Sequence, residues 1–144
     1  MKDFKKEKPD DKVLTTKHAE ISWFKAKDSL TKEAIKFTEE LGEELVDKPN
    51  YKRNAMSTSQ LRNFFGEVRR IQSNLKENKP AFYMLRPKLA YAVARARGKE
   101  NKIYRFKEVV DNILLNINPE PTEFNNFVNF LEAIVAYHKV NGGE

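Results

Sequence analysis

The sequence of 144 residues contains no cysteine and only two histidines, His18 and His138, which lie near opposite ends of the chain. Without cysteine, a disulfide framework, a thiolate metal site and a cysteine nucleophile are all excluded. No apolar run approaches the roughly 20 residues that span a bilayer, and the amino-terminal segment is too polar for a secretory signal peptide. We therefore expect an intracellular, cytoplasmic protein with no membrane partner.

Motifs that carry catalysis or bind nucleotides are also missing. The sequence has no H-E-x-x-H, no glycine-rich phosphate loop and no G-x-S-x-G. Glu39, Glu40, Glu43 and Glu44 have the spacing of a solvated helix face rather than of a general acid–base pair. His138 follows an apolar helical stretch, where a capping or packing role is commoner than catalysis. The sequence predicts a protein that is not an enzyme and that has no cofactor or metal.

The apolar residues indicate the fold. They recur at three- and four-residue steps, and no segment shows the alternation typical of a strand. We expect an all-α protein, a single compact bundle of about five helices joined by short links. Residues 1–16 are predicted to be a flexible amino-terminal segment, and residues 17–144 to be a single helical domain. The five helices are predicted over about Leu30–Val46, Ser57–Asn78, Pro87 to just before Gly98, Lys102–Ile117 and Pro121 to about Gly142.

Helix boundaries are marked by capping residues and prolines. Ser57-Thr58-Ser59-Gln60 fits a capping box with Ser57 as the N-cap and Gln60 at the third helical position. Pro80 is expected to follow the end of this helix. Pro87 fits the first position of the next helix, where a missing N–H has no cost, and Gly98 fits the position just after its end.

The middle of the chain is strongly basic. Residues 52–107 hold fifteen Lys and Arg against three Glu, a net charge of +12 in a chain whose net charge is +6, so the flanks together are acidic. This pattern is typical of a protein that binds polyphosphate. Eight of the fifteen are arginines, which bind phosphate in bidentate geometry. The scarcity of acids also leaves these cations few partners on their own helices.

Helical spacing selects particular cations within this block. Arg62, Arg69 and Lys76 recur every seven residues and therefore line one side of their helix. Lys88 and Arg95 share one face of the next helix by the same geometry. The plain alternative is a solvated face whose aliphatic stems cover apolar surface. The three tyrosines among these cations are either stacking platforms for unpaired bases or packing residues with a wet hydroxyl: Tyr83, Tyr91 and Tyr104.

Three strings of this sequence occur in a fixed order: STSQLR at 57–62, LRPKLAY at 85–91 and FLEAIVAYHK at 130–139, with Gly142-Gly143 close behind the last. Together they resemble the small subunit of type III-A CRISPR interference complexes. The resemblance covers about Ala55 to the last residue. It implies a small helical protein without a catalytic site, several copies of which stack along the guide RNA and its target. Neighbouring subunits of the Csm effector carry the catalysis in that family.

The resemblance and the helix geometry together give the predicted site. The resemblance points to Arg62, Arg86 and Lys88 as contacts to the nucleic-acid backbone. Geometry alone adds three more: Arg69, Arg70 and Arg95.

We therefore expect a non-catalytic structural subunit that binds guide RNA and target RNA without sequence specificity. It would stack with copies of itself and assemble with the other Csm subunits. The alternative is a helical interaction scaffold whose basic face docks an acidic protein partner. A third class, a small helical DNA-binding protein, lacks a convincing helix-turn-helix pair.

Overall fold

The computed structural model describes residues 18–47, 53–96 and 101–144. Within these ranges the chain forms seven helices and no strand, and the five long helices correspond to the five predicted from periodicity. The expectation of an all-α bundle is confirmed, whereas the segment predicted to be flexible, residues 1–16, lies outside the described ranges. The helices are α2 Ser22–Lys25, α3 Lys32–Leu45, α4 Thr58–Ser73, α5 Lys79–Tyr83, α6 Leu85–Arg95, α7 Ile103–Leu114 and α8 Pro121–Val140.

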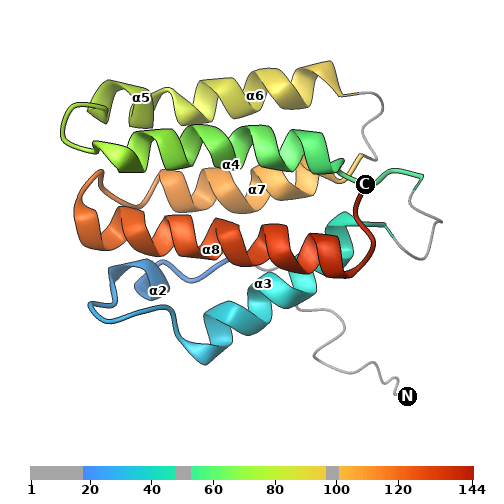
Figure 1. The fold of residues 1–144 in the computed structure, drawn as a ribbon, viewed down its shortest axis with the longest axis horizontal. Helices are drawn as coiled ribbons and strands as arrows, with labels where there is room; N and C mark the ends of the chain where they lie inside the picture. Colours follow the sequence, from blue (N-terminus) through green and yellow to red (C-terminus); the bar gives the residue numbers. More distant parts are fainter. Residues whose placement is uncertain (1–17, 48–52, 97–100) are drawn as a thin grey trace, which may run out of the picture.

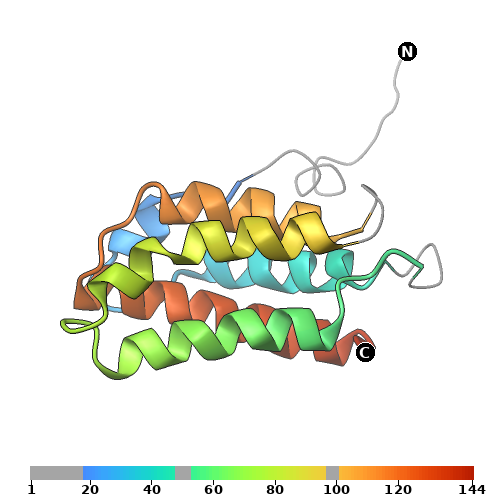
Figure 2. The same cartoon turned by 90° about the horizontal axis from the view of Figure 1, so that it is seen from above.

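The helices α4, α6, α7 and α8 lie nearly parallel to the long axis of the molecule, whereas α3 runs obliquely to it (Figure 1). The 20-residue α8 packs against α2, α3 and α4. Beyond α4 lies α6, so that α3 and α6 occupy opposite edges of the bundle in this view. Seen from above, α7 lies beside α6 (Figure 2), against which it packs. The outer layer formed by α4, α5 and α6 is thus separated from α3 by the core helix α8.

Phenylalanines from five helices fill much of the core. Phe130 of α8 contacts Phe24 of α2 edge-on, with ring centroids 5.1 Å apart, and stacks on Phe37 of α3 at 6.1 Å. On the other side of the core, Phe64 of α4 meets Phe106 of α7 at 5.6 Å. All five side chains are buried, and burying each aromatic ring stabilises the fold by about 1.5–3 kcal/mol. Of these contacts, the Phe64–Phe106 pair anchors α4 to the core beneath its outer face.

The capping prediction for α4 is confirmed. Ser57 Oγ accepts from the backbone N of Gln60 at 3.0 Å, and Gln60 Oε1 accepts from the backbone N of Ser57 at 2.7 Å. The prolines lie differently from the prediction. Pro80 is in the first turn of α5, because α4 already ends at Ser73. Pro87 is at the third position of α6, because the helix starts two residues earlier, at Leu85.

Both prolines remain within a first helical turn, where backbone N–H groups have no acceptor inside the helix. They therefore remove no helical hydrogen bond. Gly98, predicted to follow α6, lies outside the described residues; the helix ends at Arg95, with Ala96 in an extended conformation. Across the described part of the chain, no helix is both long and apolar enough to cross a bilayer.

Candidate nucleic-acid interface

The layer of α4, α5 and α6 is basic, and its charge lies at the surface. Residues 58–95 carry eight Lys and Arg against Glu67 and Glu77, and each of the eight cations is exposed. On the opposite side of α8, α3 carries five Glu against two Lys. The two edges of the bundle in Figure 1 therefore carry opposite charge. A polyanion approaching this protein is attracted to the α4–α6 side.

Three of the six predicted site residues are engaged with carboxylates of this chain. Arg70 Nη2 lies 2.7 Å and Lys88 Nζ 3.1 Å from Glu67 Oε2, while Arg86 Nε lies 3.2 Å from Asp111 Oδ1. The pairs of Lys88 and Arg86 could not be predicted from the sequence, because in both the carboxylate comes from another helix. The hydrogen bond from Arg70, supported by that from Lys88, lowers the pKa of Glu67 to about 2 against the opposing effect of partial burial.

The other three predicted site residues carry uncompensated charge. Among the described residues, Arg62, Arg69 and Arg95 make no hydrogen bond or ion pair, and all three are exposed. The guanidinium of Arg69 lies 5.8 Å from the ring centroid of Phe65, and that of Arg95 lies 5.7 Å from Tyr91. Such cation–π contacts orient a guanidinium without neutralising it. These arginines can therefore offer all their donors to a phosphate.

The six residues do not converge on one point. Arg62 lines a shallow hollow between α4 and α8, together with Phe65 and Glu132. Lys88 and Arg95 line a groove between α4 and α6, and Arg70 is joined to its wall through Glu67. Arg86 instead pairs with α7. The structure places the predicted contacts at separate points of one basic layer, which suits an extended backbone ligand better than a compact one.

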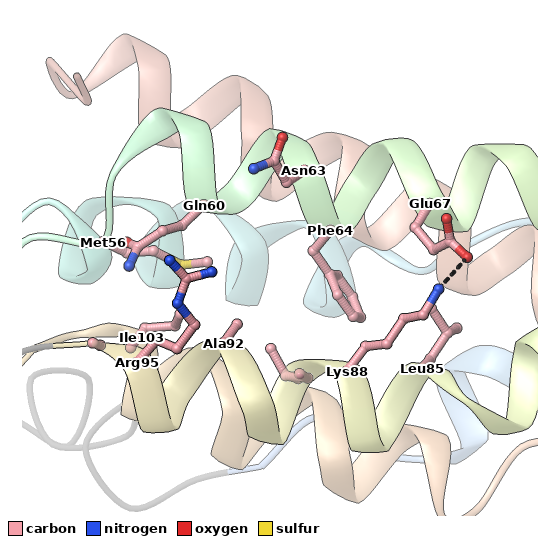
Figure 3. Close-up of a pocket in the computed structure, with 12 residues that line it drawn as sticks. Met56, Gln60, Asn63, Phe64, Glu67, Leu85, Lys88, Ala92, Arg95 and Ile103 are labelled. Carbon is pink, nitrogen blue, oxygen red and sulfur yellow. Dashed lines mark hydrogen bonds and ion pairs between the residues drawn. The ribbon is translucent and has the colours of Figure 1, made fainter.

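The groove between α4 and α6 is the feature that sequence reasoning missed. It has a volume of about 500 Å³. Met56 and Ile103 also line it, at the end where Arg95 lies (Figure 3). Figure 3 shows the Lys88–Glu67 pair at one end of the groove and Arg95 reaching toward Gln60 at the other. Its walls come from α4 (Gln60, Asn63, Phe64, Glu67), from α6 (Leu85, Lys88, Leu89, Ala92, Arg95) and from Ala96, which follows α6.

Other cations of the basic block stabilise the bundle instead. Arg105 is buried, with Nε 3.3 Å from Glu44 Oε1 and Nη1 3.0 Å from Glu108 Oε1. Lys107 Nζ forms an ion pair with Asp111. The tyrosines among the cations are exposed, at 64% for Tyr83, 67% for Tyr91 and 37% for Tyr104. Their rings are therefore available at the surface rather than part of the core.

His138 packs as the sequence predicted. It is buried, and its Nε2 lies 2.7 Å from the backbone O of Met56. Burial lowers its pKa, which keeps the ring neutral. Within the described ranges, no group of three His, Asp or Glu residues is arranged to hold a metal ion.

Comparison with known proteins now adds to this geometry. A family model described as Csm2 Type III-A matches residues 27–144. A search of curated proteins and a search of solved structures give no match. The matched range contains every long helix, the basic layer and all six predicted site residues. The chain therefore belongs to the Csm2 Type III-A family, the small structural subunit of the type III-A CRISPR complex.

Proposed function

We propose that this subunit holds RNA by its phosphates along the layer of α4, α5 and α6, without reading its sequence and without catalysing a reaction. The observation that carries the proposal is the uncompensated charge of Arg62, Arg69 and Arg95, which no carboxylate of the described residues neutralises. Phosphate contacts position a protein on a nucleic acid but carry no sequence information. That property suits a complex in which base pairing between guide and target supplies specificity.

The same charge distribution supports self-association beside the RNA. The acidic α3 and the basic α4–α6 layer lie at opposite edges of the bundle. A contact between unlike faces repeats from copy to copy and generates an open stack rather than a closed dimer. In such a stack the arginines that remain outside the contact between copies would recur at regular intervals along guide RNA and target RNA, next to the other Csm subunits.

Salt dependence of RNA binding tests the phosphate contacts. Fluorescence anisotropy with a labelled single-stranded RNA, measured at several salt concentrations, should give a log–log slope of about −0.7 per phosphate contact, or roughly −2 to −4 for three to six contacts. A second RNA of shuffled sequence should bind with similar affinity. Binding that is independent of salt, or confined to one short sequence, would refute the proposal.

The absence of catalysis has its own test. No constellation identified in the described residues can activate water, so we expect no cleavage of RNA, DNA or nucleotides when Mg²⁺ or Mn²⁺ is added. The assay adds a labelled RNA to each fraction of the protein's purification and measures its cleavage. Cleavage that coelutes with the protein and is lost on substituting one of its carboxylates would show that the chain is an enzyme.

A protein-docking role for the hollow between α4 and α8 is the second candidate, and Gly66 favours it. This glycine lies in the middle of α4, where it costs about 1 kcal/mol relative to alanine. A Cβ there would meet no atom within 4 Å among the described residues, so the chain's own packing does not require a glycine. Close approach of another protein's backbone would require a glycine at this position. Gly66→Ala should then weaken assembly with the other Csm subunits while leaving RNA affinity unchanged.

A further inference from the structure

The groove between α4 and α6 is a short compartment rather than an open channel. Lys88 and Arg95, which mark its two ends, are seven residues apart on α6 (Figure 3), or about 10 Å along the axis at roughly 1.5 Å per residue. At the Lys88 end, the ion pair to Glu67 crosses from one helix to the other. A ligand of this groove must therefore be short along the axis of α6, and it must enter from the solvent side.

The interior of this compartment is apolar. Phe64, Leu85 and Leu89 line it, and all three belong to the hydrophobic core of the bundle. Ala92 lies between the two ends, and its short side chain leaves space that a longer residue would fill. A volume of about 500 Å³ lies within the range of about 300–1,000 Å³ typical of small-ligand sites.

The rim combines positive charge with hydrogen-bonding groups. Lys88 and Arg95 bring two cations against one carboxylate, that of Glu67. Gln60 uses Oε1 in the capping box, and its amide nitrogen makes no hydrogen bond within the described part of the chain. An apolar interior with cations at both ends matches a flat aromatic group carried on a polyphosphate chain.

We propose that the α4–α6 groove receives a single unpaired nucleobase of the bound RNA, with the flanking phosphates on Lys88 and Arg95. The proposal rests on the RNA binding proposed above and adds a base-sized site to it. Apolar contact with a base is tolerant of sequence, because every base has a π-face. A base in this groove is therefore compatible with binding that does not depend on base order.

A docked protein helix fits the groove less well. A helix lying along α4 and α6 would have to break the Lys88–Glu67 pair that crosses its path. A nucleobase fits between the ends and leaves that ion pair intact. The two occupants give different results in the experiments below.

An RNA without bases separates the base site from the phosphate contacts. Two single-stranded RNAs of equal length, one normal and one with abasic ribose at every position, carry the same phosphates. The abasic strand should bind about 5- to 100-fold more weakly, as expected from the loss of base contacts, with the same salt slope. Equal affinity for the two strands would overturn the base site and leave the phosphate proposal standing. Failure of both strands to bind would overturn both proposals.

Filling the groove gives a second test with a matched control. Ala92→Leu adds apolar bulk inside the groove, and Ala94→Leu adds the same bulk at an exposed position on the same helix. Both replacements keep helix propensity high. We expect Ala92→Leu to lower affinity for normal RNA to that of the abasic strand without lowering the melting temperature, and Ala94→Leu to change neither. Unchanged RNA affinity in Ala92→Leu together with lost binding to other Csm subunits would assign the groove to a protein partner instead.

Discussion

Lys88 on α6 donates a hydrogen bond to Glu67 on α4, with 3.1 Å between Nζ and Oε2, and Glu67 also binds Arg70 at 2.7 Å. One carboxylate thus holds two of the cations predicted to bind RNA. A phosphate can bind the donors of Lys88 and Arg70 that Glu67 does not use, but it then lies close to the negative charge of Glu67. The acid therefore opposes RNA binding at this point while joining the two helices that form the groove.

Replacing this carboxylate should strengthen RNA binding. Glu67→Gln keeps the size of the side chain but frees Arg70 and Lys88, so the affinity for single-stranded RNA should rise and the salt slope should steepen by up to about 0.7 for each new phosphate contact. Exposed ion pairs contribute only about 0–1 kcal/mol to stability, so the variant should stay folded. Glu77→Gln, which removes an exposed charge with no ion pair among the described residues, is the control. Weaker RNA binding in Glu67→Gln would contradict this opposing effect.

Removing the uncompensated arginines should weaken RNA binding without unfolding the protein. Arg62→Ala with Arg69→Ala removes two exposed charges, and each lost phosphate contact should flatten the salt slope by about 0.7. Substitutions at such positions usually change stability by about 0.5 kcal/mol or less. Lys32→Ala with Lys36→Ala, on the acidic helix α3, makes the same change in net charge at the far edge of the bundle.

Anisotropy titrations and thermal melts of the two double variants separate the roles. Loss of RNA affinity confined to the α4 variant would support a localised interface. Equal loss in both variants would show that only net charge matters. A lowered melting temperature with intact affinity would make the arginines of α4 structural.

The helices were predictable from sequence because their signals are local. The capping box of α4 needs only Ser57 and Gln60, and the apolar periodicity of each long helix lies within that helix. The site was only partly predictable, because ion pairs and grooves depend on neighbours distant in sequence. Lys88 and Glu67 are 21 residues apart, and Arg86 and Asp111 are 25 apart. No helical period shows that Lys88 and Arg86 are paired or that Ala92 opens a groove.

Arg105 is another residue whose role depends on a neighbour distant in sequence. It belongs to the basic block by sequence, but it is buried between Glu44 and Glu108. Arg105→Met should destabilise the fold by about 1–3 kcal/mol, since it leaves the partly buried Glu44 without this hydrogen-bond donor. The RNA affinity of the folded protein should be unchanged. Chemical denaturation measures the first effect, and an RNA titration well below the melting temperature measures the second. Loss of RNA affinity at full folding would place Arg105 in the interface.

The core of α8 should be far more sensitive than the basic layer. Leu131 is fully buried in the helix that packs against α2, α3 and α4. Leu131→Ala should lower the free energy of unfolding by about 2–5 kcal/mol, from lost burial and the cavity left behind. Glu132→Ala, at the next and exposed position, is the control. A loss below 1 kcal/mol at Leu131 would argue against the packing described for this helix.

The stability of the bundle should fall as the pH is lowered through the range in which histidine titrates. Burial lowers the pKa of His138 in the folded protein, while the unfolded chain keeps a value near 6.5. The unfolded state therefore takes up a proton first, so the free energy of unfolding is highest above about pH 6.5 and decreases until the pH passes below the folded pKa. The slope from this one group is at most about 1.4 kcal/mol per pH unit. His138→Gln should remove that component, leaving a smaller difference in stability between pH 7 and pH 5 as measured by denaturant unfolding. If wild type and His138→Gln lose equal stability over this interval, the buried ring beside the Met56 carbonyl is not the group that titrates.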